Sequence, residues 1–348
     1  MSTTLIECET SIAPSAVSSV PGTSRMLLAL AVGLILVSAT LAAALPIGFS
    51  IITVFLFAGP HNWLEARYML SQMPARWGKL RVYFLTGILG AMLLTGLAAS
   101  MPLVGISLDF SPQSYSYLIA AWNSLLLLWI LTLSQLRAAQ NPRRNWQVAY
   151  PLTFALIAVN WLYPTTMGML LVYLHPLVAL AFLDRELARR DRLEQTNLQT
   201  PYRQALLLLP LAIFGIVVAL WNQPNLPGDD LLSQAITHHA GESAFGNVST
   251  HMLVALHTFL EMLHYGVWVV AIPLLSIRRW PWQIDTVPLT RRSPIWRQAI
   301  LGVVALGAIV MLVLWGSFLA DYPLTRNLYF TVAMLHVLAE VPFLLRLL

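Results

Sequence analysis

The sequence is poor in charged residues and has almost no cysteine. Only 10% of its 348 residues are charged, whereas an ordinary soluble domain carries about 25%. Its mean hydropathy is +0.70, so the polar residues are too few to cover a water-soluble globule, which excludes the soluble classes. The single cysteine, Cys8, excludes an internal disulfide and any thiolate-based zinc or iron–sulfur site within one chain.

The sequence instead contains a series of long apolar runs. A transmembrane helix needs about 20 predominantly apolar residues, and most of the runs are close to that length. They predict an all-α, polytopic integral membrane bundle of about ten transmembrane helices, forming a single domain over residues 26–348. The runs lie at about 26–45, 47–70, 81–100, 115–136, 148–163, 166–183, 205–221, 250–277, 296–319 and 327–347.

The connections between the runs alternate in charge. Basic residues gather at 67–81, 137–144, 185–203 and 278–297, whereas acidic residues mark the connections around Asp109, Asp229 and Asp321. Basic loops stay in the cytoplasm, so both termini are predicted there, in a membrane of the bacterial inner-membrane type. The pI of about 9.6 reflects these loops, and no nucleic-acid partner is predicted.

The first run has a polar leader. Residues 1–25 are rich in Ser, Thr and Pro and lack periodicity, which predicts a disordered cytoplasmic tail. The run 26–45 ends in a small-residue stretch like that of a cleaved signal peptide, but its acidic leader and its length argue against cleavage.

Three predicted spans contain a glutamate with a histidine four residues before it. These are the only three of the fifteen acidic residues that fall inside predicted spans. Residues four apart share one helix face, and a carboxylate at membrane depth costs several kcal/mol unless it is paired, protonated or bound to a cation. The recurrence therefore indicates a functional cluster. The pairs are His61–Glu65, His257–Glu261 and His336–Glu340.

The donor types in these pairs favour a metal ion. Imidazole with carboxylate and without thiolate suits iron, manganese or zinc, and open positions on such a site are typical of non-haem iron chemistry with oxygen. We predict one iron ion, with manganese or zinc as alternatives; the donor count also allows two ions. The carboxylates Glu65, Glu261 and Glu340 are expected to take part in catalysis by orienting the histidines or by adding ligands. The predicted metal ligands are His61, His257, His264, His336 and Glu261, with His175 as an additional candidate.

The separation of His257 and His264 restricts how they can act together. Seven helical residues span roughly 10 Å, which is too far for both imidazoles to reach one ion on a regular helix. Either a π-bulge deforms this helix, or His264 and Glu261 bind the metal while His257 has an outer role.

Other interpretations of the same residues remain open. A proton- or metal-ion-coupled transporter would use the His and Glu side chains as a relay. A haem protein would need two axial histidines but not the recurrent carboxylate, and interhelical hydrogen bonding alone would leave several groups unpaired. In the connection 222–249, His238 and His239 predict a lid or an incidental loop, with transient metal capture as the alternative. The segment 184–199 is predicted to be a solvated loop, with a surface helix as the alternative.

One short motif resembles a known family. Phe57-Ala58-Gly59-Pro60-His61-Asn62-Trp63-Leu64-Glu65 is similar to the Gly-x-Pro-His-Gly-Ala-x-Asp segment of the Brp/Blh family of membrane beta-carotene 15,15'-dioxygenases. The resemblance implies that His61 is an iron ligand and that Glu65 takes the place of the acid. It also implies further iron-binding histidines in later helices, broadly like His257 and His264. Together with a site at mid-bilayer, which lipids reach laterally, it predicts a lipid-soluble substrate such as a carotenoid or another isoprenoid.

Overall fold

The protein is an all-α bundle. The computed structural model describes residues 21–140, 146–275 and 283–347, and these residues contain helices, turns and connecting segments but no strand. The predicted fold class is confirmed. The helices are α1 (Pro21–Ala44), α2 (Pro46–Gln72), α3 (Arg81–Ser107), α4 (Pro112–Gln140), α5 (Ala149–Leu162), α6 (Pro164–Glu194), α7 (Gln199–Leu206), α8 (Leu208–Leu220), α9 (Leu231–His239), α10 (Thr250–Tyr265), α11 (Ile272–Leu275), α12 (Pro294–Ala320) and α13 (Tyr322–Leu347).

In the described part of the chain, nine helical segments are long and apolar enough to cross a membrane. In three of them consecutive helices are continuous, so that the short 3-10 helix η1 (Gly78–Leu80) with α3, α7 with α8, and α10 with α11 each count as one span. The tenth predicted span, at 148–163, corresponds to α5, which has 14 residues. A helix of that length is about 21 Å long, shorter than the roughly 30 Å hydrocarbon core.

Two boundaries differ from the predicted ones. Helix α1 begins at Pro21, so the last five residues of the predicted disordered tail are helical, and the rest of that tail lies outside the described residues. The predicted loop 184–199 is helical as far as Glu194, because α6 continues through it. The basic connections at 141–145 and 276–282 also lie outside the described residues.

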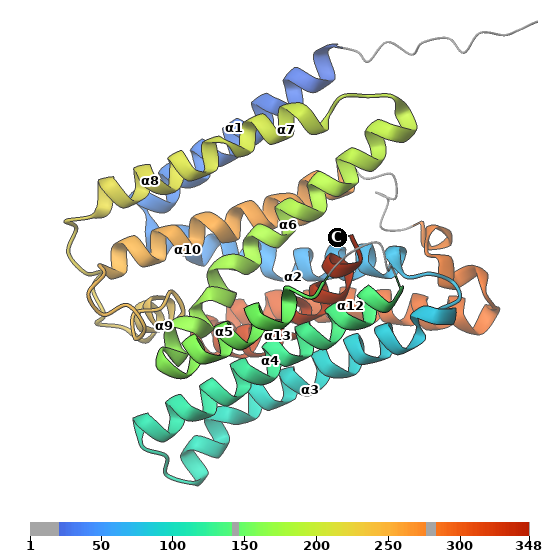
Figure 1. The fold of residues 1–348 in the computed structure, drawn as a ribbon. Helices are drawn as coiled ribbons and strands as arrows, with labels where there is room; N and C mark the ends of the chain where they lie inside the picture. The colour runs from blue at the N-terminus through green and yellow to red at the C-terminus, as the bar shows by residue number, and fades with distance from the viewer. Residues whose placement is uncertain (1–20, 141–145, 276–282, 348) are drawn as a thin grey trace, which may run out of the picture.

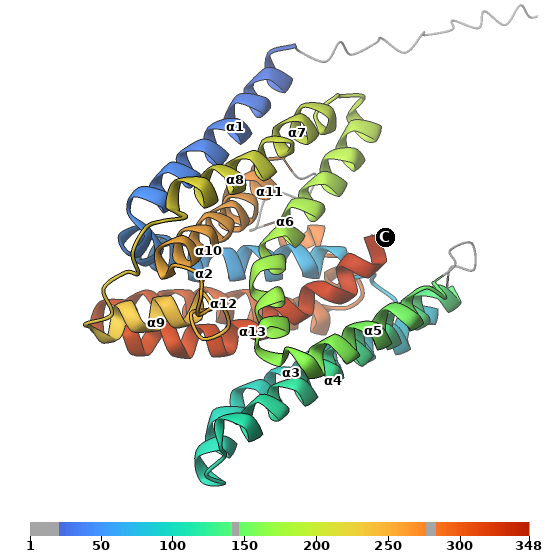
Figure 2. The same ribbon diagram turned by 60° about the vertical axis from the view of Figure 1, so that its left-hand side comes forward.

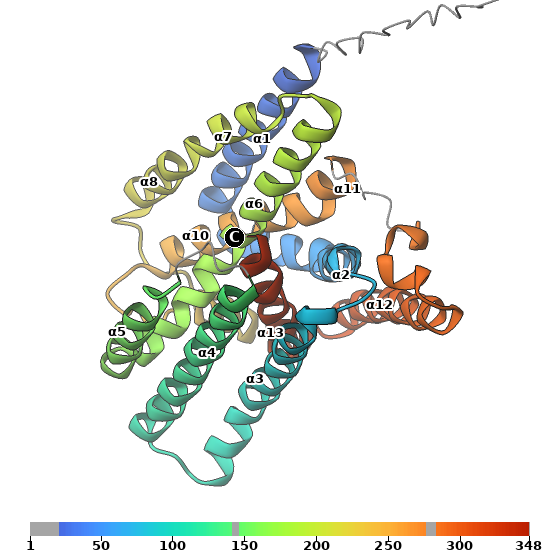
Figure 3. The ribbon, with the colours of Figure 1, turned by 45° about the vertical axis from the view of Figure 1, so that its right-hand side comes forward.

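The helices form three groups. Helices α3, α4 and α5 lie along one side of the molecule, and α1, α7 and α8 lie along the other (Figure 1). Helix α6 crosses from one group to the other (Figure 2). Helices α2, α6, α10 and α13 meet in the middle, with α12 packed against α2 and α13 (Figure 3). The four central helices are those that carry the predicted site residues.

Helix α10 is the most enclosed span. In its most apolar stretch 61% of the residues are buried, compared with 11% for α12. Helix α1 covers its outer face so closely that a Cβ added to Gly266 would lie 2.7 Å from Leu34 Cδ2. Directly after α10 the chain forms a π-helical turn, Gly266–Ala271, before it continues into α11. Because α10 contacts α1, α2, α6, α8 and α9, its side chains can meet those of both halves of the chain.

Candidate metal centre

Four histidines from four different helices face one another in the middle of the bundle. The centroid of the His61 ring on α2 lies 5.3 Å from that of His264 on α10 and 5.1 Å from that of His336 on α13. The fourth imidazole is that of His175 on α6, whose ring centroid lies 4.5 Å from that of His264 and 5.2 Å from that of His336. His264 and His336 lie opposite each other at 6.3 Å. The imidazoles therefore surround one small volume.

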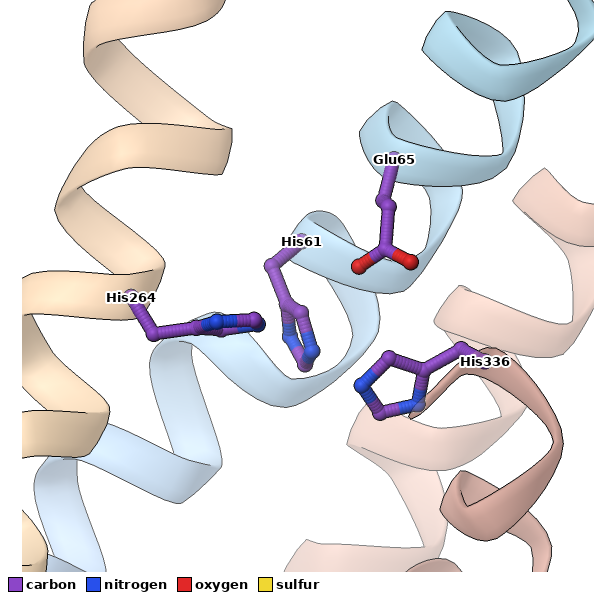
Figure 4. Close-up of side chains that lie close together, drawn as sticks. All are labelled: His61, Glu65, His264 and His336. Atoms are coloured by element: carbon purple, nitrogen blue, oxygen red, sulfur yellow. The ribbon is translucent and has the colours of Figure 1, made fainter. Parts of the chain in front are cut away.

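Two carboxylates lie at the edge of this volume. One ligand atom from each of His61, Glu65, His264 and His336 can be chosen so that all four lie within 4.8 Å of one another; their side chains converge from three helices in Figure 4. The same holds for His175, His264 and Glu340. His264 belongs to both sets, so the six side chains form one continuous cluster. We call these six residues, His61, Glu65, His175, His264, His336 and Glu340, the central cluster.

Hydrogen bonding fixes the orientation of the ring at His61. Its Nδ1 lies 2.8 Å from the carbonyl oxygen of Phe57, and because a carbonyl can only accept, Nδ1 must donate. This leaves the lone pair of Nε2 for another partner. At His175, Nδ1 lies 3.1 Å from Glu340 Oε2. Metal-binding histidines commonly direct their second nitrogen at a carbonyl or carboxylate in this way.

Several buried polar atoms of the central cluster have no hydrogen-bond partner among the described residues. They include both ring nitrogens of His264 and of His336, and Oε2 of Glu65. An unpaired buried polar group costs about 1 to 3 kcal/mol, so this many in one place would be strongly destabilising. A cation could take one nitrogen from each imidazole together with a carboxylate oxygen, and the residues present therefore fit a metal ion.

The predicted ligands His257 and Glu261 do not lie with this cluster. They form a separate group with His239 of α9, in which the three ligand atoms lie within 4.8 Å of one another. The reason is helical rise: α10 is regular from Thr250 to Tyr265, so His257 and His264 stay roughly 10 Å apart along the axis. The π-helical turn begins only at Gly266 and cannot bring them together. His175, an additional candidate in the sequence, lies beside His264 and His336, and its ligand atom groups with those of His264 and Glu340.

Both groups line one cavity. It has a volume of about 220 Å³ and includes His61, His175, His264 and His336 in its wall, together with His239, His257 and Glu261. The remaining wall is mostly apolar and comes largely from α3, α4, α6 and α13, with residues such as Met101, Ile119, Trp122, Leu171 and Met334. The site is thus a polar centre inside an apolar chamber.

A second hollow adjoins the cavity between α3 and α4. It has a volume of about 170 Å³, and Met101 and Trp122 line both spaces. Its other lining residues include Leu97 and Leu125, whose side chains are 37% and 48% exposed. Helices α3 and α4 are membrane-spanning by length and composition, so this hollow lies beside the cavity between two candidate spans.

Proline and the π-helical turn shape the backbone around the ligands. Pro60 precedes His61 and Pro176 follows His175, and each proline removes one backbone hydrogen bond from its helix. Both helices nevertheless continue through the proline. After His264, the π-helical turn contains Trp268, which is fully buried with its ring 6.4 Å from that of His264. π-Turns of this kind are frequent at functional sites.

No family model matches the chain, and neither a curated protein nor a solved structure matches it. The function is therefore inferred from the geometry of the described residues.

Proposed function

We propose that the protein is a membrane-embedded oxidoreductase that uses one iron ion, bound by the central cluster, to oxidise a lipid-soluble substrate with molecular oxygen. The observation that carries the proposal is the set of four imidazoles from α2, α6, α10 and α13, which lie around one small volume and include ring nitrogens without hydrogen-bond partners in the described structure. Iron is preferred over manganese and zinc because imidazole-rich, thiolate-free sites with open positions suit oxygen chemistry.

Each residue of the central cluster has a defined part in this proposal. His61, His175, His264 and His336 hold the metal. Phe57 and Glu340 orient two of these rings through their Nδ1 atoms, which also raises the basicity of the nitrogen that faces the metal. Glu65 adds negative charge and a further oxygen donor. When bound, iron supplies the activation of oxygen, and the surrounding apolar wall excludes water from that reaction.

The size and the apolar wall of the cavity favour a long apolar substrate. Its volume of about 220 Å³ is below the 300–1,000 Å³ typical of small-molecule pockets, so an extended chain would place only its reacting section beside the cluster. The adjoining hollow between α3 and α4 would hold the next section and admit it from the lipid. A carotenoid or another isoprenoid has this shape, and the motif around His61 that resembles the Brp/Blh dioxygenases supports the same class.

Metal analysis and turnover together test the proposal. The purified protein should contain one tightly bound iron per chain and lack the intense absorption of haem. With oxygen and carotenoid-containing vesicles it should consume the carotenoid, and it should not do so without oxygen. His264→Ala should lose both the iron and the turnover. His251→Ala is the matched control, because His251 lies on the same helix but contacts the carbonyl of Ala43 on α1.

A transporter would give a different set of results. A protein that contains no tightly bound transition metal, and that moves protons or divalent ions across reconstituted vesicles, is a transporter, and the oxidoreductase proposal is then wrong.

A further inference from the structure

The group formed by His239, His257 and Glu261 is separate from the central cluster and has its own donor set. His239 comes from α9, in the connection between the spans that end at Leu220 and begin at Thr250, whereas His257 and Glu261 lie one turn apart on α10. His257 Nδ1 is 3.5 Å from Glu261 Oε2, and the His239 ring centroid is 4.9 Å from that of His257. Two imidazoles and one carboxylate thus converge from two elements.

The environment of the three donors favours a bound cation. His257 and Glu261 are buried, and Glu261 Oε2 has no hydrogen-bond partner in the described part of the chain.

We propose that His239, His257 and Glu261 form a second metal site, which binds a zinc ion and fastens α9 over the cavity. Two histidines and one glutamate are the protein ligands of established zinc sites, in which a fourth position is left for water or substrate. Here the fourth position faces the cavity, because all three residues line it. The site does not depend on the proposed iron chemistry.

The structure explains why only one histidine of the adjacent pair takes part. His239 turns inward and stacks on Phe330 of α13, with ring centroids 3.8 Å apart, whereas His238 is exposed. Successive residues of a helix point about 100° apart, so α9 can direct only one of the two at α10. His238 consequently provides a matched control for any change at His239.

Arg326 sets the expected affinity. Its guanidinium lies 4.9 Å from the centroid of the same Phe330 ring and is held by Tyr322 Oη and Ser50 Oγ. A fixed positive charge close to the site opposes a cation. We therefore expect zinc here to be released by a chelator before the iron of the central cluster, which has four histidines.

The first test is metal content in purified protein loaded with zinc and iron. The wild-type protein should hold one zinc and one iron per chain. His239→Ala and Glu261→Gln should each lose the zinc and keep the iron, whereas His264→Ala should lose the iron and keep the zinc. His238→Ala should keep both metals. Zinc retained by His239→Ala, or zinc lost equally by His238→Ala, would refute the second site. Loss of iron from His264→Ala in the same experiment would show that the central cluster still binds its own metal, so failure of the second site can be told apart from failure of the central cluster.

The second test does not depend on how the variants fold. Glu242, the only glutamate in the connection 222–249, follows α9 directly and accepts a hydrogen bond from Thr237 at 2.7 Å. With zinc bound, wild-type protein should resist a glutamate-specific protease at this position, and removal of zinc with a chelator should accelerate cleavage at least tenfold. A cleavage rate that is unchanged by chelation would show that no metal fastens α9.

Discussion

The contact between Glu340 and His175 allows the affinity of the central cluster for iron to be tested by one conservative substitution. In the wild-type protein His175 Nδ1 lies 3.1 Å from Glu340 Oε2. Glu340→Gln keeps the size of the side chain and a carbonyl oxygen that can accept a hydrogen bond from His175 Nδ1, but it removes the negative charge. Loss of such an orienting carboxylate typically weakens metal binding ten- to hundredfold, which corresponds to about 1.4 to 2.7 kcal/mol. The variant should therefore bind iron more weakly but still bind it.

The assay is an anaerobic titration with ferrous iron, in competition with a coloured chelator, on metal-free protein in detergent. Glu186→Gln is the matched control, because Glu186 is also buried and lies on α6 with His175, but hydrogen-bonds to Tyr68 away from the cluster. An unchanged dissociation constant for Glu340→Gln would refute its orienting role. Complete loss of iron in both Glu340→Gln and Glu65→Gln would instead indicate that the carboxylates are direct ligands of two metals.

Three further predictions concern the site and the topology. His257→Ala should retain the iron that His264→Ala loses, since the two rings belong to different groups; equal retention of iron in both variants would argue against the metal role of α10, and the measurement is elemental analysis of purified protein. A reporter fused after Arg144 should be cytoplasmic and one fused near Asp229 should lie on the opposite face; activity of both reporters on one side would contradict the predicted topology. Prolonged dialysis against a chelator should abolish carotenoid turnover, and ferrous iron should restore it where zinc does not; recovery with zinc alone would exclude oxygen activation by iron.

Much of the fold could be predicted from the sequence because a membrane restricts the alternatives. About 20 apolar residues between charged connections suffice to define a spanning helix, and nine of the ten predicted runs correspond to such helices. The predicted end of α6 was wrong, because its charged end continues the helix to Glu194. The apolar run ends near residue 183, but helical backbone hydrogen bonding continues beyond it.

The depth of the site residues could be predicted, but not their partners. Counting along each span places His61, His257, Glu261, His264, His336 and Glu340 near one level; His61, His264 and His336 do meet, whereas His257 and Glu261 form a separate group with His239. The repeated spacing of four places Glu340 on the same helix face as His336, yet Glu340 contacts His175 of α6. Which helix faces which depends on packing between distant segments, and no spacing within one helix reports it.

His239 shows the limit of prediction from hydropathy. It lies outside the apolar runs, and the sequence indicated only a lid or an incidental loop. Its inward direction results from the packing of α9 against α10 and α13. The adjacent His pair was the available signal, because one of two successive helical residues can face inward while the other remains exposed.

The origin of the central cluster in four separate helices has a consequence for biosynthesis. His61 and His336 are 275 residues apart (336 − 61), and at roughly 5 to 20 residues per second a ribosome needs on the order of 15 to 55 s to add the second after the first. During that interval Glu65 is in the membrane without the helices that will surround it. If the central cluster binds iron as proposed, loading therefore follows insertion of α13, and a chain that stops before α13 keeps the Glu65 carboxylate in the bilayer without the helices that surround it in the complete bundle.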